Sequence, residues 1–382
     1  MANGTGNGGL LGEFAVTGRF DGGNPQRSSD IVKVDEATFD VFPYSEDGDD
    51  NYMFRADVRV CSSHREPRPV TLRFEWRAWR AERYMDLRDT FFCRHEEGEW
   101  KLVRGRVEGN VTTLTLVIPP GETEVSMNAG YNYERLQTYV RSLRGNPDAS
   151  ARIIGFSEES RNIWCLTLTD GNVPDGGKRK LMAIGRVHPY ETASSYCIEA
   201  MVNYLLGGDP RAKELMSKFV FHFIPMPNPD GVYNGLCKLT KENGLDFSHG
   251  NILASKDKAG KTLLSFARVA KPDYVLDVHS LMDREYDQVG SSDERLLGRF
   301  MNLMPDQADV GRRWTILKQR GREALGPKEK RTDYGFTSFC VEELGATKFV
   351  LGFSWFGRSF DKMEKTAIKA LNALASAIMG VG

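Results

Sequence analysis

The feature of this sequence that most constrains its fold is a change in hydrophobic periodicity near residue 129. Before this point, stretches such as Val70–Trp76 and Val111–Ile118 alternate apolar with polar residues, and turn-forming clusters such as Glu46–Asn51 separate them. Alternation with a period of two is typical of strands with one buried face. Short strands separated by regular turns favour a β-sandwich. We therefore expect an antiparallel β-sandwich over residues 11–129.

The second part of the chain has a different pattern, which begins after Pro119-Pro120-Gly121. From Tyr133 onward apolar residues recur at helical spacing, and short apolar stretches follow in alternation with helical ones. This alternation indicates an α/β domain with a mixed, mainly parallel sheet covered by helices, which we assign to residues 130–382. Its expected strands are 151–156, 162–168, 180–187, 219–224, 274–278, 314–317, 337–341 and 349–351, and its expected helices are 133–144, 192–206, 260–269, 291–304 and 360–379.

Composition limits the choice of partners and compartment. Lys and Arg number 51 against 52 Asp and Glu, so the formal net charge of −1 favours neither a nucleic acid nor an anionic membrane as partner. No stretch approaches the 18 or so apolar residues of a transmembrane helix. Residues 1–10 lack the basic and apolar regions of a signal peptide, and we expect a flexible leader there. The six scattered cysteines predict free thiols and a cytoplasmic location.

The tetrapeptide His188-Pro189-Tyr190-Glu191 stands where an expected strand gives way to an expected helix. In α/β sheets, ligands bind at this carboxyl edge. Imidazole and carboxylate are both good zinc ligands, and a catalytic zinc site uses three protein ligands with one open position. His188 and Glu191 therefore supply two candidate ligands, although the same spacing also fits an ordinary helix-capping turn.

A third candidate ligand is His279, which ends the apolar stretch Tyr274–Val278. His188 and His279 thus follow expected strands of the same sheet and should meet at one edge. His222, within Phe221-His222-Phe223, is expected to be structural instead. The sequence therefore predicts a metal site of two histidines and one glutamate.

Hydrolysis at such a metal also needs a carboxylate that takes a proton from water and returns it to the leaving amine. The stretch Phe339–Glu343 reads as the end of a strand, which would place Glu342 at the same sheet edge. Glu343 would then point to the opposite face. We therefore expect Glu342 to be the general base.

Taken together, these motifs resemble those of the zinc metallocarboxypeptidases and are most similar to the cytosolic carboxypeptidase branch. The resemblance covers residues 11–379 and includes an N-terminal β-sandwich. Its motifs are His-Pro-x-Glu at 188–191, Pro225–Val232, the strand-ending His279, Val341-Glu342, and Tyr131-Asn132-Tyr133 at the start of a helix.

The resemblance implies a function for each candidate residue. His188, Glu191 and His279 would hold one zinc ion, and Glu342 would act as general base and acid. The substrate would be the C-terminal peptide or isopeptide bond of a peptide or protein. Pro225–Val232 would be an architectural turn.

Two departures from the family pattern concern the substrate. Lys238 stands where the family has an oxyanion-stabilising arginine, so the charge is kept without the guanidinium fork. Asp246-Phe247-Ser248-His249 stands where the family has Asp-Leu-Asn-Arg. Asp246 fits the carboxylate that orients a zinc-bound histidine, whereas Ser248 and His249 do not reproduce a bidentate clamp for the substrate's carboxylate.

Three explanations of the altered clamp remain open at this point. Protonated His249 would be a weaker clamp, an arginine among Arg320, Arg322 and Arg331 would replace it, or the substrate would lack a free α-carboxylate, as in an amidase or deacylase. Tyr334 is a candidate for the phenol that closes over the substrate, although a packing role is the simpler expectation. A catalytically silent binding module is the remaining alternative.

Overall fold

The computed structural model describes residues 12–44, 46, 55–76, 88–281, 285–304, 313–317, 331, 333–354, 356 and 358–380. The expected leader, Arg320 and Arg322 lie outside these residues. The chain divides into two compact units, of which the first comprises residues up to Gly130 together with Tyr233–Cys237. The second comprises Tyr131–Val232 and Lys238–Gly382. The division thus falls next to the boundary expected at residue 129.

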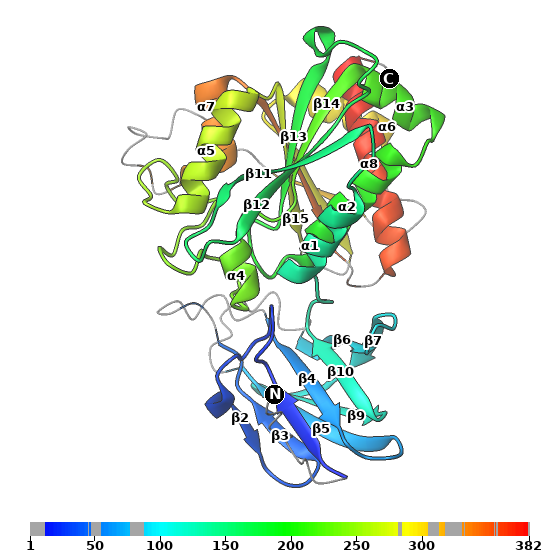
Figure 1. Ribbon diagram of the computed structural model, residues 1–382, viewed down its shortest axis with the longest axis vertical. Coiled ribbons are helices and arrows are strands. Elements are labelled where there is room, and N and C mark those ends of the chain that lie inside the picture. The colour runs from blue at the N-terminus through cyan, green and yellow to red at the C-terminus, as the bar shows by residue number, and fades with distance from the viewer. Residues whose placement is uncertain are drawn as a thin grey trace, which may run out of the picture. The chain divides into compact units, whose positions relative to one another are not determined.

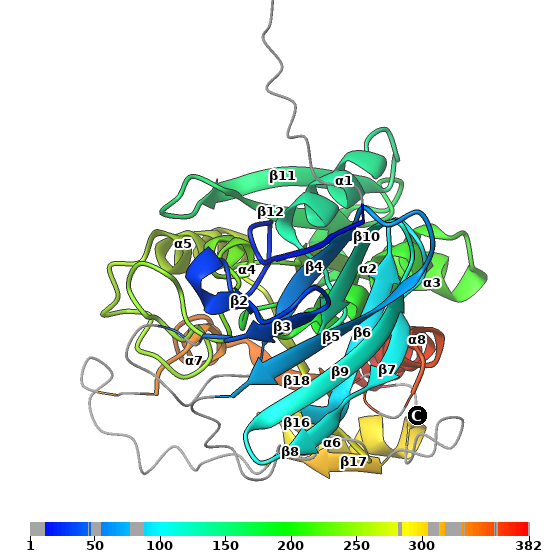
Figure 2. The same ribbon diagram turned by 90° about the horizontal axis from the view of Figure 1, so that it is seen from below.

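Within its described residues the first unit contains two five-stranded sheets (Figures 1 and 2). Phe74 and Phe91, one from each sheet, stack with ring centroids 4.6 Å apart. The sheets therefore form a sandwich, with one parallel pair, β3 with β5, among otherwise antiparallel strands. One sheet contains β1 (Phe14–Thr17), β4 (Asp57–Ser62), β10 (Gly121–Ser126), β6 (Thr90–His95) and β7 (Lys101–Arg104), and the other contains β2 (Ile31–Lys33), β3 (Thr38–Val41), β5 (Arg68–Glu75), β9 (Val111–Ile118) and β8 (Arg106–Glu108).

The second unit is built on a mixed eight-stranded sheet in the order β11-β12-β14-β13-β15-β18-β16-β17. The four central strands β14, β13, β15 and β18 run parallel to one another, so their carboxyl ends meet at one edge. The strands are β11 (Ala149–Phe156), β12 (Asn162–Leu168), β13 (Arg179–Gly185), β14 (Phe219–Ile224), β15 (Tyr274–Ser280), β16 (Tyr286–Ser291), β17 (Arg313–Ile316) and β18 (Thr347–Phe353).

Helices cover both faces of this sheet (Figure 1). Helices α5 and α7 pack on one face, and α2, α3, α6 and α8 lie on the other. The helices are α1 (Tyr133–Ser142), α2 (Thr192–Leu206), α3 (Pro210–Lys218), α4 (Pro229–Tyr233), α5 (Lys258–Ala270), α6 (Glu294–Leu303), α7 (Phe336–Leu344) and α8 (Phe360–Met379). Among the described helices, none has the length and apolar content needed to cross a bilayer.

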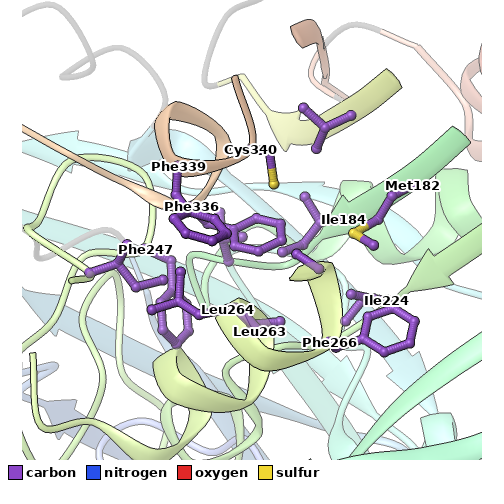
Figure 3. Close-up of a cluster of buried hydrophobic side chains, with 14 of the residues drawn as sticks. Met182, Ile184, Ile224, Phe247, Leu263, Leu264, Phe266, Phe336, Phe339 and Cys340 are labelled. Carbon is purple, nitrogen blue, oxygen red and sulfur yellow. The ribbon is translucent and has the colours of Figure 1, made fainter. Parts of the chain in front are cut away.

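The core beneath α5 and α7 shows why one expected strand is wrong. Residues 337–341 were expected to form a strand, but they belong to helix α7. Phe336, Phe339 and Cys340 recur at helical spacing and are buried against β13 and α5 (Figure 3). The helix ends at Gly345, whose φ of 73° is the left-handed conformation that favours glycine at this position.

Candidate metal centre

Three side chains converge at the carboxyl ends of β13 and β15. His188 Nδ1 lies 2.8 Å from Glu191 Oε1, and His279 Nδ1 lies 2.9 Å from Glu191 Oε2. One atom from each of the three residues lies within 4.8 Å of the others. The structure therefore brings together the three ligands predicted from the sequence.

The loop that carries His188 is held by a buried arginine. Arg186 directly follows β13 and has a φ of 56°, which is uncommon for a residue with a side chain. Its guanidinium donates to the carbonyl oxygens of Pro189 at 2.7 Å and Tyr131 at 2.9 Å. Its backbone N–H donates to Ser194 at the start of α2. Arg186 thus fixes the turn on which His188 and Glu191 lie, a role that the sequence analysis missed.

Each metal-facing histidine is also held from its far side by a carboxylate. His188 Nε2 lies 3.1 Å from Asp246 Oδ1, the contact expected for Asp246. His279 Nε2 lies 3.1 Å from Asp277 Oδ1 on the same strand. Such carboxylate–histidine pairs orient the ring and increase its basicity as a ligand. Asp277 was not predicted, although its position two residues before His279 places it on the same sheet face.

The Asp246 segment is in turn fixed by close backbone contacts. Asp246 Oδ1 also accepts from the backbone N–H groups of Ser248 and His249. Phe336 N donates to Phe247 O at 2.8 Å. A Cβ on Gly335 would lie only 2.2 Å from Ser248 O, so this approach requires glycine.

The electrostatics of the three residues favour positive charge beside Glu191. Burial disfavours charge on His279, but Asp277 and Glu191 outweigh it, and the pKa of His279 is raised well above its ordinary value. The pKa of His188 is raised in the same way: burial alone would lower it, but the neighbouring Glu191 and Asp246 outweigh burial. Despite its burial, Glu191 has a pKa well below the usual range because both histidines face it.

The chemistry of this donor set fits zinc. Two imidazoles and one carboxylate form the three-ligand set of a catalytic zinc site, and the outer carboxylates complete it. Binding of a divalent cation would require both histidines in their neutral form and Glu191 as a carboxylate.

The prediction that Glu342 ends a strand at this edge is wrong. Glu342 lies in the second half of α7, six residues after Phe336, which corresponds to about 9 Å along the helix. The helix then leads into Thr347, the first residue of β18, which pairs with Tyr274 at the amino end of β15. Glu342 therefore lies toward the opposite edge of the sheet. Glu343, its neighbour in α7, likewise does not lie on a strand.

The contacts of Glu342 agree with a structural role. Arg331 Nη1 donates to Glu342 Oε1 at 2.8 Å, and both side chains are largely buried. Arg331 is thus already paired with a carboxylate, which argues against its use as the substrate clamp. Tyr334 is fully buried in the α5–α7 core, so its ring is packed rather than exposed to substrate.

The altered clamp residues lie next to the metal ligands. The rings of His249 and His188 are nearly parallel, with centroids 6.5 Å apart, and 64% of the His249 side chain is exposed. Lys238 Nζ lies 3.1 Å from Asp246 Oδ2. Both Lys238 and His249 are thus connected to the metal site through Asp246, as the residue order suggested. Ser248 contributes its backbone N–H to the same carboxylate.

His222 has the structural surroundings that were expected. It lies within β14, and its Nδ1 is 3.0 Å from the Thr167 hydroxyl. Burial lowers the pKa of His222 to about 4, so the ring is neutral at pH 7.

Comparison with known proteins supports this assignment. A sequence model of the zinc carboxypeptidase family matches residues 136–242. Cytosolic carboxypeptidase 6 of Mus musculus is 40% identical over 109 residues, which are 28% of this chain and 20% of the mouse protein. The protein of the same name from Caenorhabditis elegans is 31% identical over 110 residues, 28% of this chain and 24% of that protein. The matched segment thus spans about a fifth of these relatives.

Solved structures extend the likeness to nearly the whole chain. A metallo-carboxypeptidase from Burkholderia cenocepacia superimposes with a TM-score of 0.76, covering 97% of this chain and 100% of that one at 17% identity. A metallo-carboxypeptidase from Pseudomonas aeruginosa, in complex with (2-guanidinoethylmercapto)succinic acid, gives 0.76 at 15% identity, with 96% and 100% covered. At this identity the likeness concerns the fold. Residues 136–242 are therefore similar to the zinc carboxypeptidase family, and the chain as a whole has the fold of solved metallo-carboxypeptidases.

Proposed function

We propose that this chain is a zinc-dependent metallocarboxypeptidase that acts on the C-terminal peptide or isopeptide bond of a peptide or protein. The observation that carries the proposal is the convergence of His188, Glu191 and His279, with Asp246 and Asp277 behind the two rings. The family match contains His188 and Glu191. His279 lies beyond the matched residues and is supported by its geometry.

Each residue has a defined part in this function. His188, Glu191 and His279 would hold one zinc ion, which supplies an acidified water and polarises the scissile carbonyl. Lys238 brings a positive charge beside the ligands and would stabilise negative charge on the carbonyl oxygen. His249, exposed beside His188, and Ser248 would contact the substrate's terminal carboxylate.

The location follows from the cysteines and the substrate class. All six cysteines are free thiols, which agrees with a reducing compartment. We therefore keep the cytoplasm as the proposed location, with a peptide or protein C-terminus as the proposed partner.

A second candidate function, a zinc-containing binding module without turnover, is favoured by one observation. Among the described residues, the carboxylates that contact the ligand histidines are Glu191, Asp246 and Asp277, and all three are engaged with those rings. Glu342, the expected base, lies elsewhere. A binding protein needs the metal and the substrate contacts but no proton acceptor.

The test measures zinc per chain and cleavage of matched peptides with free and amidated C-termini. We expect one zinc per chain and, where cleavage occurs, a preference for the free C-terminus. Absence of zinc would contradict the proposal, and equal cleavage of both peptides would replace the carboxypeptidase with an amidase. Binding of the free peptide without cleavage would select the binding module.

A further inference from the structure

The strand beside the metal-binding strand ends without a polar side chain. In the parallel pairing of β15 with β18, His279 is the partner of Gly352. In the antiparallel pairing of β16 with β18, Gln288 is the partner of the same glycine. Partners in register point to the same sheet face and lie about 4.8 Å apart. A side chain at position 352 would therefore stand beside His279 on the side where the metal ligands lie.

Position 352 has the location that a proton acceptor for the hydrolytic water would need. In amide hydrolysis, one proton of water passes to an acceptor as the new C–O bond forms. The acceptor then gives it to the nitrogen as the C–N bond breaks. The acceptor must stand beside the metal without being occupied by the ligand histidines, which excludes Glu191, Asp246 and Asp277.

The side chain of Gln288 occupies the space over Gly352. A Cβ added at residue 352 would lie 2.9 Å from Gln288 Cβ and 3.0 Å from its Oε1. A carboxamide forms hydrogen bonds but does not take up a proton near neutral pH. The residues in register across β15, β18 and β16 are thus the ligand histidine His279, Gly352 and the neutral amide Gln288.

We propose that position 352 is the proton-acceptor position of this metal centre and that Gly352, covered by Gln288, leaves the position without an acceptor. The inference rests on the proposed function, because it assumes that zinc and a C-terminal peptide bind at the three ligands. The consequence is a site that binds such peptides well and hydrolyses them slowly. The specific activity of this chain is then set by a missing side chain rather than by the metal.

The test restores the acceptor and provides a neutral match for it. The double variant Gly352→Glu with Gln288→Ala places a carboxylate at the position and removes the side chain that would obstruct it. The matched control is Gly352→Gln with Gln288→Ala, which differs only in charge and proton affinity. Gln288→Ala alone measures the effect of the cleared space.

Three quantities are measured on each zinc-loaded protein. They are zinc per chain, the Kd of a peptide with a free C-terminus by calorimetry, and its cleavage by mass spectrometry over pH. We expect zinc content and peptide Kd to stay within a few-fold of the parent in all variants. The carboxylate variant should cleave about 10²–10⁴-fold faster than its glutamine match. Its rate should also acquire an acidic limb that the match lacks.

Two results would overturn the inference. One is equal cleavage by the carboxylate and glutamine variants when both are folded and bind zinc and peptide. The other is a parent chain whose cleavage is lost in Glu342→Gln while zinc and peptide binding are kept, which would return the base to α7. A parent chain that binds neither zinc nor the peptide would instead refute the proposed function, so the two failures are distinguishable.

Discussion

Strands β15 and β18 are neighbours in one parallel sheet, yet their carboxyl ends carry different chemistry. The second-last residue of β15 is His279, whose two ring nitrogens face Asp277 and Glu191. β18 ends at Gly352 and Phe353, with no ionisable side chain at the position in register with His279. The comparison teaches that holding a metal and moving a proton depend on different residues. The candidate ligands for the first task converge at one point, whereas among the described residues the β18 position in register with His279 carries no side chain for the second.

The largest effect is expected from removing a ligand on the β15 side. His279→Gln keeps the approximate size of the side chain but loses the basic ring nitrogen, so zinc affinity should fall by more than about 100-fold. Zinc per chain after dialysis against a weak chelator measures the effect. His222→Gln, a change in the same sheet away from the ligands, should keep its zinc. Full zinc in His279→Gln would remove the predicted ligand set.

The next effect concerns Arg186, which supports the turn carrying the other ligands. Arg186→Met removes two buried hydrogen bonds from a charged donor, those to the carbonyl oxygens of Pro189 and Tyr131, so the free energy of unfolding should fall by about 3 kcal/mol. Urea unfolding measures it. Arg179→Met, an exposed change at the start of β13, should stay within about 0.5 kcal/mol. Similar losses in both variants would deny Arg186 its special role.

A smaller effect tests the carboxylate behind His279. Asp277→Asn should raise the Kd for zinc by about 10–100-fold, because the ring loses its charged orienting partner while the ligand atom remains. Competition with a chelator of known affinity measures it, with exposed Asp148→Asn as the control. An unchanged Kd would mean that Asp277 does not contribute to metal binding by His279.

The smallest effect is a pH dependence away from the metal. The pKa of buried His222 is lowered to about 4, so the unfolded chain binds a proton on this residue before the folded chain does. The stability that depends on a neutral His222 is complete above pH 6.5 and falls as the pH decreases toward 4. Between pH 7 and 5.5 the loss should be about 1 kcal/mol. Unfolding of the parent and of His222→Gln is measured side by side at each pH. The stability of the parent should fall more steeply with decreasing pH, and an identical pH dependence of the two proteins would contradict the prediction.

Much of the candidate site could be predicted because its residues lie near the carboxyl ends of apolar strands, and these ends are visible in the sequence. Asp277 could have been found from the strand period of two, because it lies two residues before His279 and so on the same sheet face. Glu342 was misplaced because Phe339-Cys340-Val341 is compatible with both a strand and a buried helix face. The helical spacing of the apolar residues Phe336, Phe339 and Cys340 was the signal that favoured the helix.

Gly352 and Arg186 could not be predicted from the sequence for two different physical reasons. A missing side chain leaves no pattern, so the significance of Gly352 depends on its register with His279. A buried arginine looks like a surface arginine until its carbonyl partners are known, and one of them, Tyr131, lies 55 residues away. Both features depend on contacts between distant parts of the sequence.

Gly335 gives the metal site a point of vulnerability outside its own residues. Because its Cα lies against the Ser248 carbonyl, even one added methyl group must push the Asp246 segment or the start of α7 aside. A Gly335→Ala substitution would therefore disturb the orientation of His188 without altering any charge or ligand. In a collection of natural variants, loss of zinc affinity would then be found at a residue that has no polar side chain and no contact with the ion.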